Sequence, residues 1–243
     1  MYAIETRKLT KKYKEKTAVN AIDLAVNEGE FFALLGVNGA GKTTTARMLT
    51  CLSKPTSGEA FINGHNVVTG RDAVKAVTGI SPQDTAVAAK LTVRENLNLM
   101  AKVYGLDKEK AKRRTEEMLD ELGLREYENA LAKTLSGGWM RRLSIAMSLL
   151  SEPKVLFLDE PTLGLDVLAR RELWRVIRRL KGTMTVVLTT HYMEEAEELA
   201  DRIAIMIGGK IAACGTLAEI EETAGVKGLE NAFVAIAEGG TDK

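Results

Sequence analysis

A glycine-rich loop that ends in a lysine and a threonine is the stretch of this chain best suited to chemistry. It reads GVNGAGKT from Gly36 to Thr43 and fits the phosphate-binding pattern G-x-x-x-x-G-K-[ST]. The apolar run Phe31–Leu35 before it predicts a buried strand, and Thr44–Leu52 after it predicts a helix. In such a loop, backbone N–H groups and a helix N-terminus converge on one anion. Lys42 would reach the β- and γ-phosphates of a nucleotide, and the Thr43 hydroxyl would bind Mg²⁺.

An acidic pair, Asp159 and Glu160, follows the apolar run Val155–Leu158, which is typical of a central parallel strand. Residues that follow parallel strands meet in the crevice at the carboxyl ends of the sheet, where the loop after Leu35 also opens. There Asp159 can hold Mg²⁺ and Glu160 can polarise an attacking water. The alternative is a solvated acidic turn.

Ser136, Gly137 and Gly138 precede a helix that is expected to start near Trp139. Small residues at a helix start can form a second anion-binding terminus, because no bulky side chain covers the free N–H groups. On its own, the same tetrapeptide Leu135–Gly138 is equally an ordinary helix cap.

Three further side chains are candidates of lower specificity. His191 follows a predicted strand over 185–190 and would lie at the same sheet edge, where it could contact a γ-phosphate, although a lone histidine is more often structural. Gln83 could reach Mg²⁺ or its water. Tyr13 could stack on a base or could be an ordinary surface tyrosine.

The elements that must position these residues form an α/β frame. Strand and helix patterns alternate along the chain, which implies a parallel sheet covered on both faces. Short strands are expected within residues 1–30, and Asp166 is expected to cap a helix. Further predicted segments are the strands Val77–Ser81, Thr185–Leu188 and Ile203–Ile207, the helix Glu194–Ala200, and a short amphipathic helix around Leu229–Ile236.

The sequence pattern of residues 87–151 predicts an all-helical insertion in this α/β frame. Thr92 and Glu95 form a T-x-x-E capping box, and Asp107 starts a charged helix. Helical spacing of apolar residues continues through residues 140–150.

Bulk composition sets limits on function. The 243 residues carry a net charge of +1, which gives no electrostatic reason to expect nucleic acid as the main partner. Cys51 and Cys214 lack metal-site spacing and are expected to be reduced, in a cytosolic protein. Met1–Thr10 is too polar for a secretory signal, and no apolar run approaches the roughly 18 residues of a membrane span. A role at a membrane would therefore require docking to another chain.

Together these motifs resemble the nucleotide-binding subunit of an ABC transporter, from Tyr13 to about Gly215. Gly36–Thr43 resembles the Walker A loop, Val155–Glu160 the Walker B strand, and Leu135–Gly138 the family signature. The resemblance implies catalytic roles for Glu160, His191 and Lys42 and metal contacts for Thr43, Gln83 and Asp159. It implies ATP-binding roles for Tyr13, Gly36, Asn38, Gly39, Ala40, Gly41, Lys42, Thr43, Thr44, Ser136, Gly137, Gly138 and Asp166.

The family implies a fold and a mechanism. The fold is a P-loop NTPase (RecA-like) core with an N-terminal antiparallel β-subdomain and an inserted α-helical subdomain. Residues 1–86 and 152–243 would form the β-subdomain and core, and residues 87–151 the helical subdomain. Two copies would sandwich two Mg²⁺-ATP molecules, each held by Walker A of one copy and the signature of the other. Closure would move integral membrane permease subunits, with the ATPase peripheral at the cytoplasmic face and no nucleic acid partner.

The segments His191–Ala196, Asp201–Ala204 and Leu229–Phe233 resemble ATPases of prokaryotic ABC-2-type exporters of drugs, lipids or polysaccharide. The alternatives are an importer ATPase or a soluble ABC ATPase. A DNA-repair ATPase would need a long coiled-coil insertion, a translation factor would need two cassettes, and a P-loop GTPase would need an N-K-x-D motif. None of these features is present.

One residue departs from the family pattern. The signature's usual fifth residue is glutamine, and here it is Trp139. The backbone donors and Ser136 are kept, so the phosphate contact is expected to survive, while Trp139 is a candidate for packing between two copies. Trp139→Gln is accordingly expected to keep ATPase activity within about tenfold.

Overall fold

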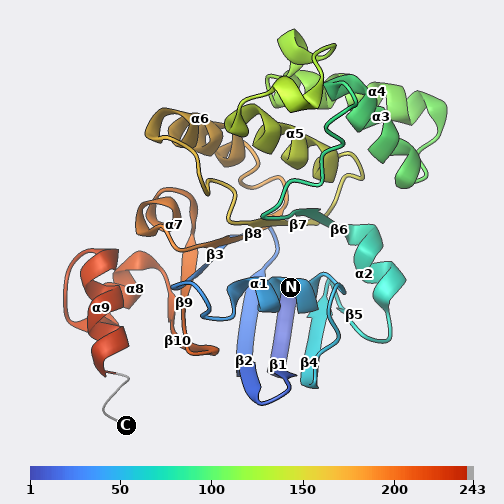
Figure 1. Cartoon of the computed structure of the whole chain (residues 1–243). Coiled ribbons are helices and arrows are strands. Elements are labelled where there is room, and N and C mark those ends of the chain that lie inside the picture. Colours follow the sequence, from blue (N-terminus) through green and yellow to red (C-terminus); the bar gives the residue numbers. More distant parts are fainter. Residues whose placement is uncertain (240–243) are drawn as a thin grey trace.

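The structure is a computed structural model that describes residues 1–239, so the last four residues of the predicted domain lie outside it. A six-stranded sheet lies in the middle, with helices α3–α6 on one side and a four-stranded sheet on the other (Figure 1). Within residues 1–239 no helix is both long and apolar enough to cross a membrane.

The four-stranded sheet is antiparallel and carries the N-terminus. Its strand order is β2-β1-β4-β5, made of β1 (Tyr2–Tyr13), β2 (Lys16–Asn27), β4 (Ser57–Ile62) and β5 (His65–Asn66). The short strands expected here are in fact two long ones of 12 residues each. The tight β1–β2 turn pairs Tyr13 with Lys16 and so places both at one end of the sheet.

The six-stranded sheet has the order β10-β9-β3-β8-β7-β6, and only the edge strand β10 is antiparallel. The central strands are buried throughout, as expected of parallel strands covered on both faces. The strands are β3 (Phe31–Leu35), β6 (Thr78–Ser81), β7 (Val155–Asp159), β8 (Thr185–Thr190), β9 (Arg202–Ile207) and β10 (Lys210–Gly215).

Most helices follow the predicted pattern, with shifted ends. The helix expected at Thr44–Leu52 begins two residues earlier, and the strand expected at Val77 begins at Thr78, because Val77 ends a helix that was not predicted. The helices are α1 (Lys42–Leu49), α2 (Arg71–Val77), α3 (Val93–Val103), α4 (Lys108–Glu121), α5 (Gly137–Leu149), α6 (Val167–Arg178), α7 (Met193–Leu199), α8 (Leu217–Ala224) and α9 (Leu229–Gly239), with 3₁₀ turns η1 (Arg125–Tyr127) and η2 (Ala132–Thr134).

The predicted helical insertion is helical from Val93 onward, and its caps form as expected. Thr92 accepts a hydrogen bond from the Glu95 backbone N–H (3.1 Å), while the Glu95 carboxylate accepts from the Thr92 backbone N–H (2.8 Å). Asp107 caps α4. Because the last helix, α5, packs on β6, β7 and α6 as well as on α3 and α4, it joins the helical segment to the sheet.

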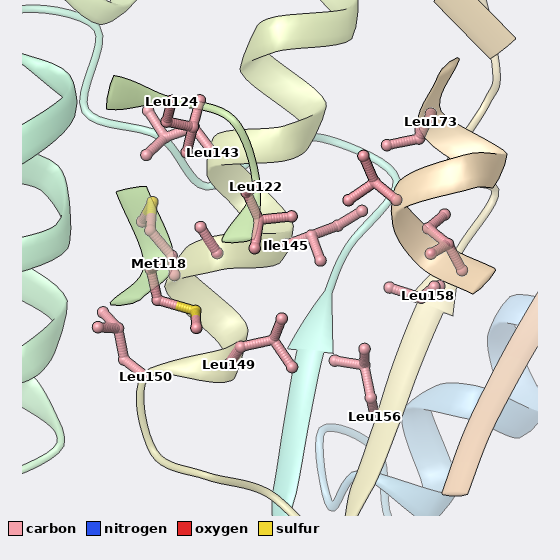
Figure 2. Close-up of a cluster of buried hydrophobic side chains, with 14 of the residues drawn as sticks. Met118, Leu122, Leu124, Leu143, Ile145, Leu149, Leu150, Leu156, Leu158 and Leu173 are labelled. Atoms are coloured by element: carbon pink, nitrogen blue, oxygen red, sulfur yellow. The ribbon is translucent and has the colours of Figure 1, made fainter. Parts of the chain in front are cut away.

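Alternate residues of the central strands face two separate cores. On one face, Leu156 and Leu158 of β7 pack with Ile145 and Leu149 of α5 and Leu173 of α6 (Figure 2). On the other face, side chains of β7 pack with α1 and the antiparallel sheet. Burying each such side chain contributes about 1.5–3 kcal/mol, so the two cores together hold β7 in place.

Candidate functional site

A cleft of about 490 Å³ lies where the two sheets meet. Its walls come from β1, β2, the glycine-rich loop, α1 and the segments that follow β6, β7 and β8. The lining residues are Tyr13, Lys16, Ala18, Asn38, Gly39, Ala40, Gly41, Lys42, Thr43, Thr44, Gln83, Glu160, Leu163 and His191. The fold therefore gathers most of the predicted nucleotide-binding residues into one place.

The glycine-rich loop needs its glycines for space as well as for backbone conformation. Gly41 has a φ of +109°, and a Cβ there would lie 2.4 Å from the carbonyl oxygen of Ala18. A Cβ on Gly36 would lie 2.4 Å from the carbonyl oxygen of Met206. Gly41 is also the N-cap of α1 and supplies no capping side chain, which leaves the first N–H groups of the helix available to an anion.

Two backbone hydrogen bonds connect this loop to the antiparallel sheet. The N–H of Gly209, in the turn between β9 and β10, donates to the Ala40 carbonyl (3.0 Å). The carbonyl of Gly209 in turn accepts from the N–H of Asn20 in β2 (2.8 Å). The loop is thus held from both sheets at once.

Lys42 is buried, with 5% of its surface exposed, and is fully engaged within the cleft. Its Nζ donates to the carbonyl of Gly36 (2.7 Å) and to that of Val37 (3.3 Å). It also pairs with Oε1 of Glu160 at 3.1 Å. A buried ammonium group needs such partners, because an unpaired charge at this depth would be strongly destabilising.

Glu160 joins two of the predicted catalytic groups. Its other carboxylate oxygen, Oε2, lies 2.7 Å from Nδ1 of His191, so the carboxylate bridges His191 and Lys42. Its backbone φ is +49°, a left-handed value that costs a non-glycine residue about 1–3 kcal/mol. The Glu160 N–H is held by Thr189 of the neighbouring strand, at 3.0 Å to the carbonyl and 3.1 Å to the hydroxyl. This turn aims the carboxylate into the cleft.

Asp159 and Thr43 form an oxygen-rich pair beneath the loop. The Thr43 hydroxyl donates to Oδ1 of Asp159 at 3.1 Å, and the Thr189 hydroxyl donates to the same oxygen. Within residues 1–239 no group of three or more histidine, cysteine, aspartate or glutamate side chains could hold a metal ion. One carboxylate and one hydroxyl fit Mg²⁺, which usually binds few protein oxygens and completes its shell with water and substrate phosphates.

The signature residues and Asp166 do not line this cleft. Asp166 caps α6, accepting hydrogen bonds from the N–H groups of Leu168 (2.9 Å) and Ala169 (3.0 Å). A Cβ on Gly137 would lie 3.3 Å from Cδ2 of Leu165, which places the start of α5 against the start of α6. The structure therefore brings the signature and Asp166 together but apart from the cleft of the same chain.

Two buried charges near the site were not identified from the sequence. Arg141 of α5 donates to the carbonyls of Pro82 (2.6 Å) and Gln83 (2.8 Å), and burial lowers the pKa of its guanidinium. It fixes the Gln83 segment to the signature helix. The only sign of its burial in the sequence is that Arg141 lies beside the apolar positions of the predicted helix. Lys16 and Leu163 of the cleft wall were also missed, because their placement depends on how the two sheets meet.

The second buried charge is Glu195 of α7, which is fully buried. Its Oε1 accepts a hydrogen bond from the indole Nε1 of Trp174 in α6 at 3.0 Å. Burial raises the pKa of Glu195, against smaller opposing effects of hydrogen bonds that include those of Thr190 and Trp174. The Glu195 carboxyl group therefore lies buried outside the cleft, between the helices that follow Asp166 and His191.

Comparisons with known proteins agree with this geometry. A family model described as ABC transporter matches residues 19–163. The chain is 44% identical over 225 residues to the daunorubicin/doxorubicin resistance ATP-binding protein DrrA of Streptomyces peucetius, covering 92% of this chain and 68% of DrrA. It is 43% identical over 203 residues to the human phospholipid-transporting ATPase ABCA3, covering 84% of this chain and 12% of ABCA3.

Solved structures give the same result. The ATP-binding subunit of an ABC transporter matches with a TM-score of 0.85 and 30% identity, over 96% of this chain and 99% of that one. A dimeric ATP-binding cassette in a post-hydrolysis state with ADP and Pi matches with a TM-score of 0.79 and 27% identity, over 88% and 98% of the two chains. A subunit of the cbiONQ transporter complex from Clostridium perfringens matches with a TM-score of 0.82 and 25% identity, over 91% of each chain.

Proposed function

The chain belongs to the ABC transporter ATP-binding family, and on that premise we propose which of its residues bind and hydrolyse ATP and what the protein moves. It is an ATPase with the P-loop core of that family. The observation that carries the assignment of roles is the Glu160 carboxylate, which contacts both Lys42 and His191 inside the cleft of the glycine-rich loop.

In the proposed complex the cleft holds one ATP molecule along its length. Tyr13, with 47% of its surface exposed at the end of β1, stacks on the base. The N–H groups from Gly39 to Thr44 surround the phosphates, and the positive end of α1 points at them. Lys42 turns its ammonium group away from Glu160, its 3.1 Å partner in the structure, toward the β- and γ-phosphate oxygens.

This change of partner by Lys42 prepares the hydrolytic step. The Glu160 carboxylate is engaged by Lys42 in the structure, and it becomes free to bind a water once Lys42 turns to phosphate. Glu160 then orients a water and accepts its proton. His191, 2.7 Å from Glu160, holds the carboxylate in place and presents its ring to the γ-phosphate. The left-handed backbone at Glu160 keeps the carboxylate directed into the cleft throughout.

Thr43 and Asp159 are the residues that would hold Mg²⁺, with the Gln83 side chain reaching the ion or its water. When bound, the ion neutralises charge that develops between the β- and γ-phosphates. The hydrogen bonds that Asp159 accepts from Thr43 and Thr189 keep its carboxylate in position for this role.

The signature is proposed to act on a second copy of the ATPase. Ser136, Gly137 and Gly138 lie outside their own cleft, at an edge where large apolar side chains around Asp166 are exposed. These are Val167 (60% exposed) and Leu168 (74% exposed). Exposed apolar groups beside a free helix N-terminus fit an interface that closes over the γ-phosphate of a second copy.

The proposed partners are integral membrane permease subunits, with the ATPase peripheral at the cytoplasmic face of the membrane. The proposed cargo is a drug or a lipid, moved outward. Two relatives support this cargo: DrrA is named as a drug-resistance ATP-binding protein, and ABCA3 is named as a phospholipid-transporting ATPase. The related cbiONQ subunit, which is part of a transporter complex, supports a multi-subunit assembly.

Two measurements test this function. Purified protein should retain ATP with magnesium, and the Lys42→Ala variant should not. Wild-type protein that neither retains nor hydrolyses ATP would contradict the assigned cleft. Pull-down from membranes should recover a protein with many membrane spans in a nucleotide-dependent manner, and recovery of soluble partners alone would favour a non-transport ATPase.

A further inference from the structure

The indole of Trp139 packs within its own chain. Trp139 is the third residue of α5, and its side chain is half-buried. Its ring centroid lies 4.5 Å from that of Tyr127 in η1, and the Arg142 guanidinium lies 4.4 Å from its centre. A Cβ built on Gly123 would lie 4.0 Å from Trp139 Cζ3, so the indole also covers the turn after α4. The ring is therefore held by three neighbours within the helical segment.

Arg142 extends this packing to two further helices. Its Nη2 donates to Oε2 of Glu172 in α6 at 3.1 Å, and its Nη1 donates to the carbonyl of Leu122 at the end of α4 at 3.5 Å. A guanidinium stacked on an indole while bound to a carboxylate is well suited to hold three elements together, because its planar group serves both contacts. Trp139 thus connects the start of α5, through Arg142, to α4 and α6.

The first turn of α5 has few other anchors. The Ser136 side chain makes no capping hydrogen bond, and Gly137 and Gly138 have no side chains. Both glycines lie close to the start of α6. A Cβ on Gly138 would lie 3.5 Å from the Cβ of Ala169, and the corresponding distance from Gly137 to Leu165 is 3.3 Å. Trp139 is therefore the first residue of α5 whose side chain can fix this turn against its surroundings.

We infer that Trp139 is a positioning residue, which holds the Ser136–Gly138 turn in line with α6 through Tyr127 and Arg142 and does not itself contact nucleotide. The inference rests on the proposed function, in which this turn donates to the γ-phosphate in a second copy. Backbone donors must be placed accurately, since a shift of about 1 Å can cost on the order of 10²-fold in rate. In this chain Trp139, stacked with Tyr127 and Arg142, takes the place of the usual glutamine and holds the backbone donors of the Ser136–Gly138 turn in position.

The test compares Trp139→Ala and Trp139→Phe with Tyr104→Ala. Tyr104 is a half-buried aromatic residue in the same helical segment, outside the Trp139 contacts, and serves as the matched control. Three properties are measured. ATP binding by the single chain and the kinetic constants kcat and KM are measured with Glu160 intact, and ATP-dependent dimerisation is measured in a Glu160→Gln background.

We expect Trp139→Ala to lower kcat and weaken dimerisation by about tenfold, while ATP binding by the single chain stays within about twofold. Trp139→Phe, which keeps an aromatic face for Tyr127 and Arg142, should recover most of the loss. Tyr104→Ala should lower the melting temperature and leave kcat within about twofold, because its effect is only on packing.

Three results would overturn the inference: an unchanged kcat in Trp139→Ala, a Phe variant as impaired as the Ala variant, or weakened ATP binding by the single chain. If Trp139→Ala does not fold, Arg142→Gln breaks the same connection while keeping the indole, and unchanged dimerisation in that variant would refute the inference. Failure of the proposed function would give a different result from failure of this inference. In that case the Glu160→Gln protein would remain monomeric with ATP even when Trp139 is intact.

Discussion

We expect Glu160→Gln to separate ATP binding from ATP hydrolysis in this ATPase. The substitution keeps the size and shape of the side chain and removes its charge and basicity. The amide oxygen can still accept from Lys42, which lies 3.1 Å from Oε1, and Lys42 retains the carbonyls of Gly36 and Val37. The cleft should therefore keep its geometry, and ATP should bind at least as tightly as to the wild type.

The expected loss of rate follows from the role of the carboxylate. A positioned general base contributes about 10²–10⁴-fold, which corresponds to about 3–5 kcal/mol of activation free energy. Glu160→Gln should lower kcat by that factor with little change in KM. Because the ATP-bound state no longer decays, two copies should remain associated around it.

The assays are steady-state phosphate release and light scattering coupled to gel filtration, with and without saturating Mg²⁺-ATP. A Glu160→Gln protein that stays monomeric with saturating ATP would contradict the two-copy mechanism. A kcat within tenfold of wild type would show that another group acts as the base. Asp159→Asn is a useful comparison, since it should impair the magnesium-dependent step and ATP binding together.

Three further predictions follow from single contacts. Lys42→Ala should weaken ATP binding by about 10–100-fold, the value of a charged hydrogen bond, as measured by equilibrium titration; unchanged affinity would refute the role of Lys42. Thr92→Ala removes a helix cap and should lower the free energy of unfolding by about 1 kcal/mol, measured by denaturant titration. Glu195→Gln should change the pH dependence of stability. Because the unfolded carboxyl ionises near 4.5 and the buried one at a higher pH, wild-type stability should fall as pH rises above 4.5 until the raised pKa is passed. The Gln variant should lack that fall, so equal slopes in denaturation at pH 5–8 would contradict the prediction.

Local chemistry made much of the site predictable from the sequence. The glycine-rich loop, the acidic pair at the end of β7 and the capping residues Thr92 and Asp166 are each marked by a short local pattern, and the structure contains the loop, the strand end and both caps. In contrast, the partners of Arg141 and the position of Lys16 in the cleft arise from packing between distant segments, for which one sequence gives no local signal.

The missed helices differ in how far they could have been predicted. α2 has seven residues with only Val74 buried and no capping side chain, so neither periodicity nor a cap marks it. α8 carries a complete capping box between Thr216 and Glu219, the same T-x-x-E signal that correctly predicted α3. α8 is only eight residues long, with Ile220 alone buried, but its capping box could have predicted it.

The hydrogen bonds of Gly209 to Ala40 and Asn20 have a consequence for unfolding. Residues of both sheets line the nucleotide cleft, and this turn ties them to each other, so neither sheet can separate without destroying the binding site. A ligand that binds only the intact arrangement stabilises it by RT ln(1 + [L]/Kd), about 2.7 kcal/mol at a ligand concentration of 100 Kd. Bound nucleotide should therefore make the two sheets melt as a single cooperative unit.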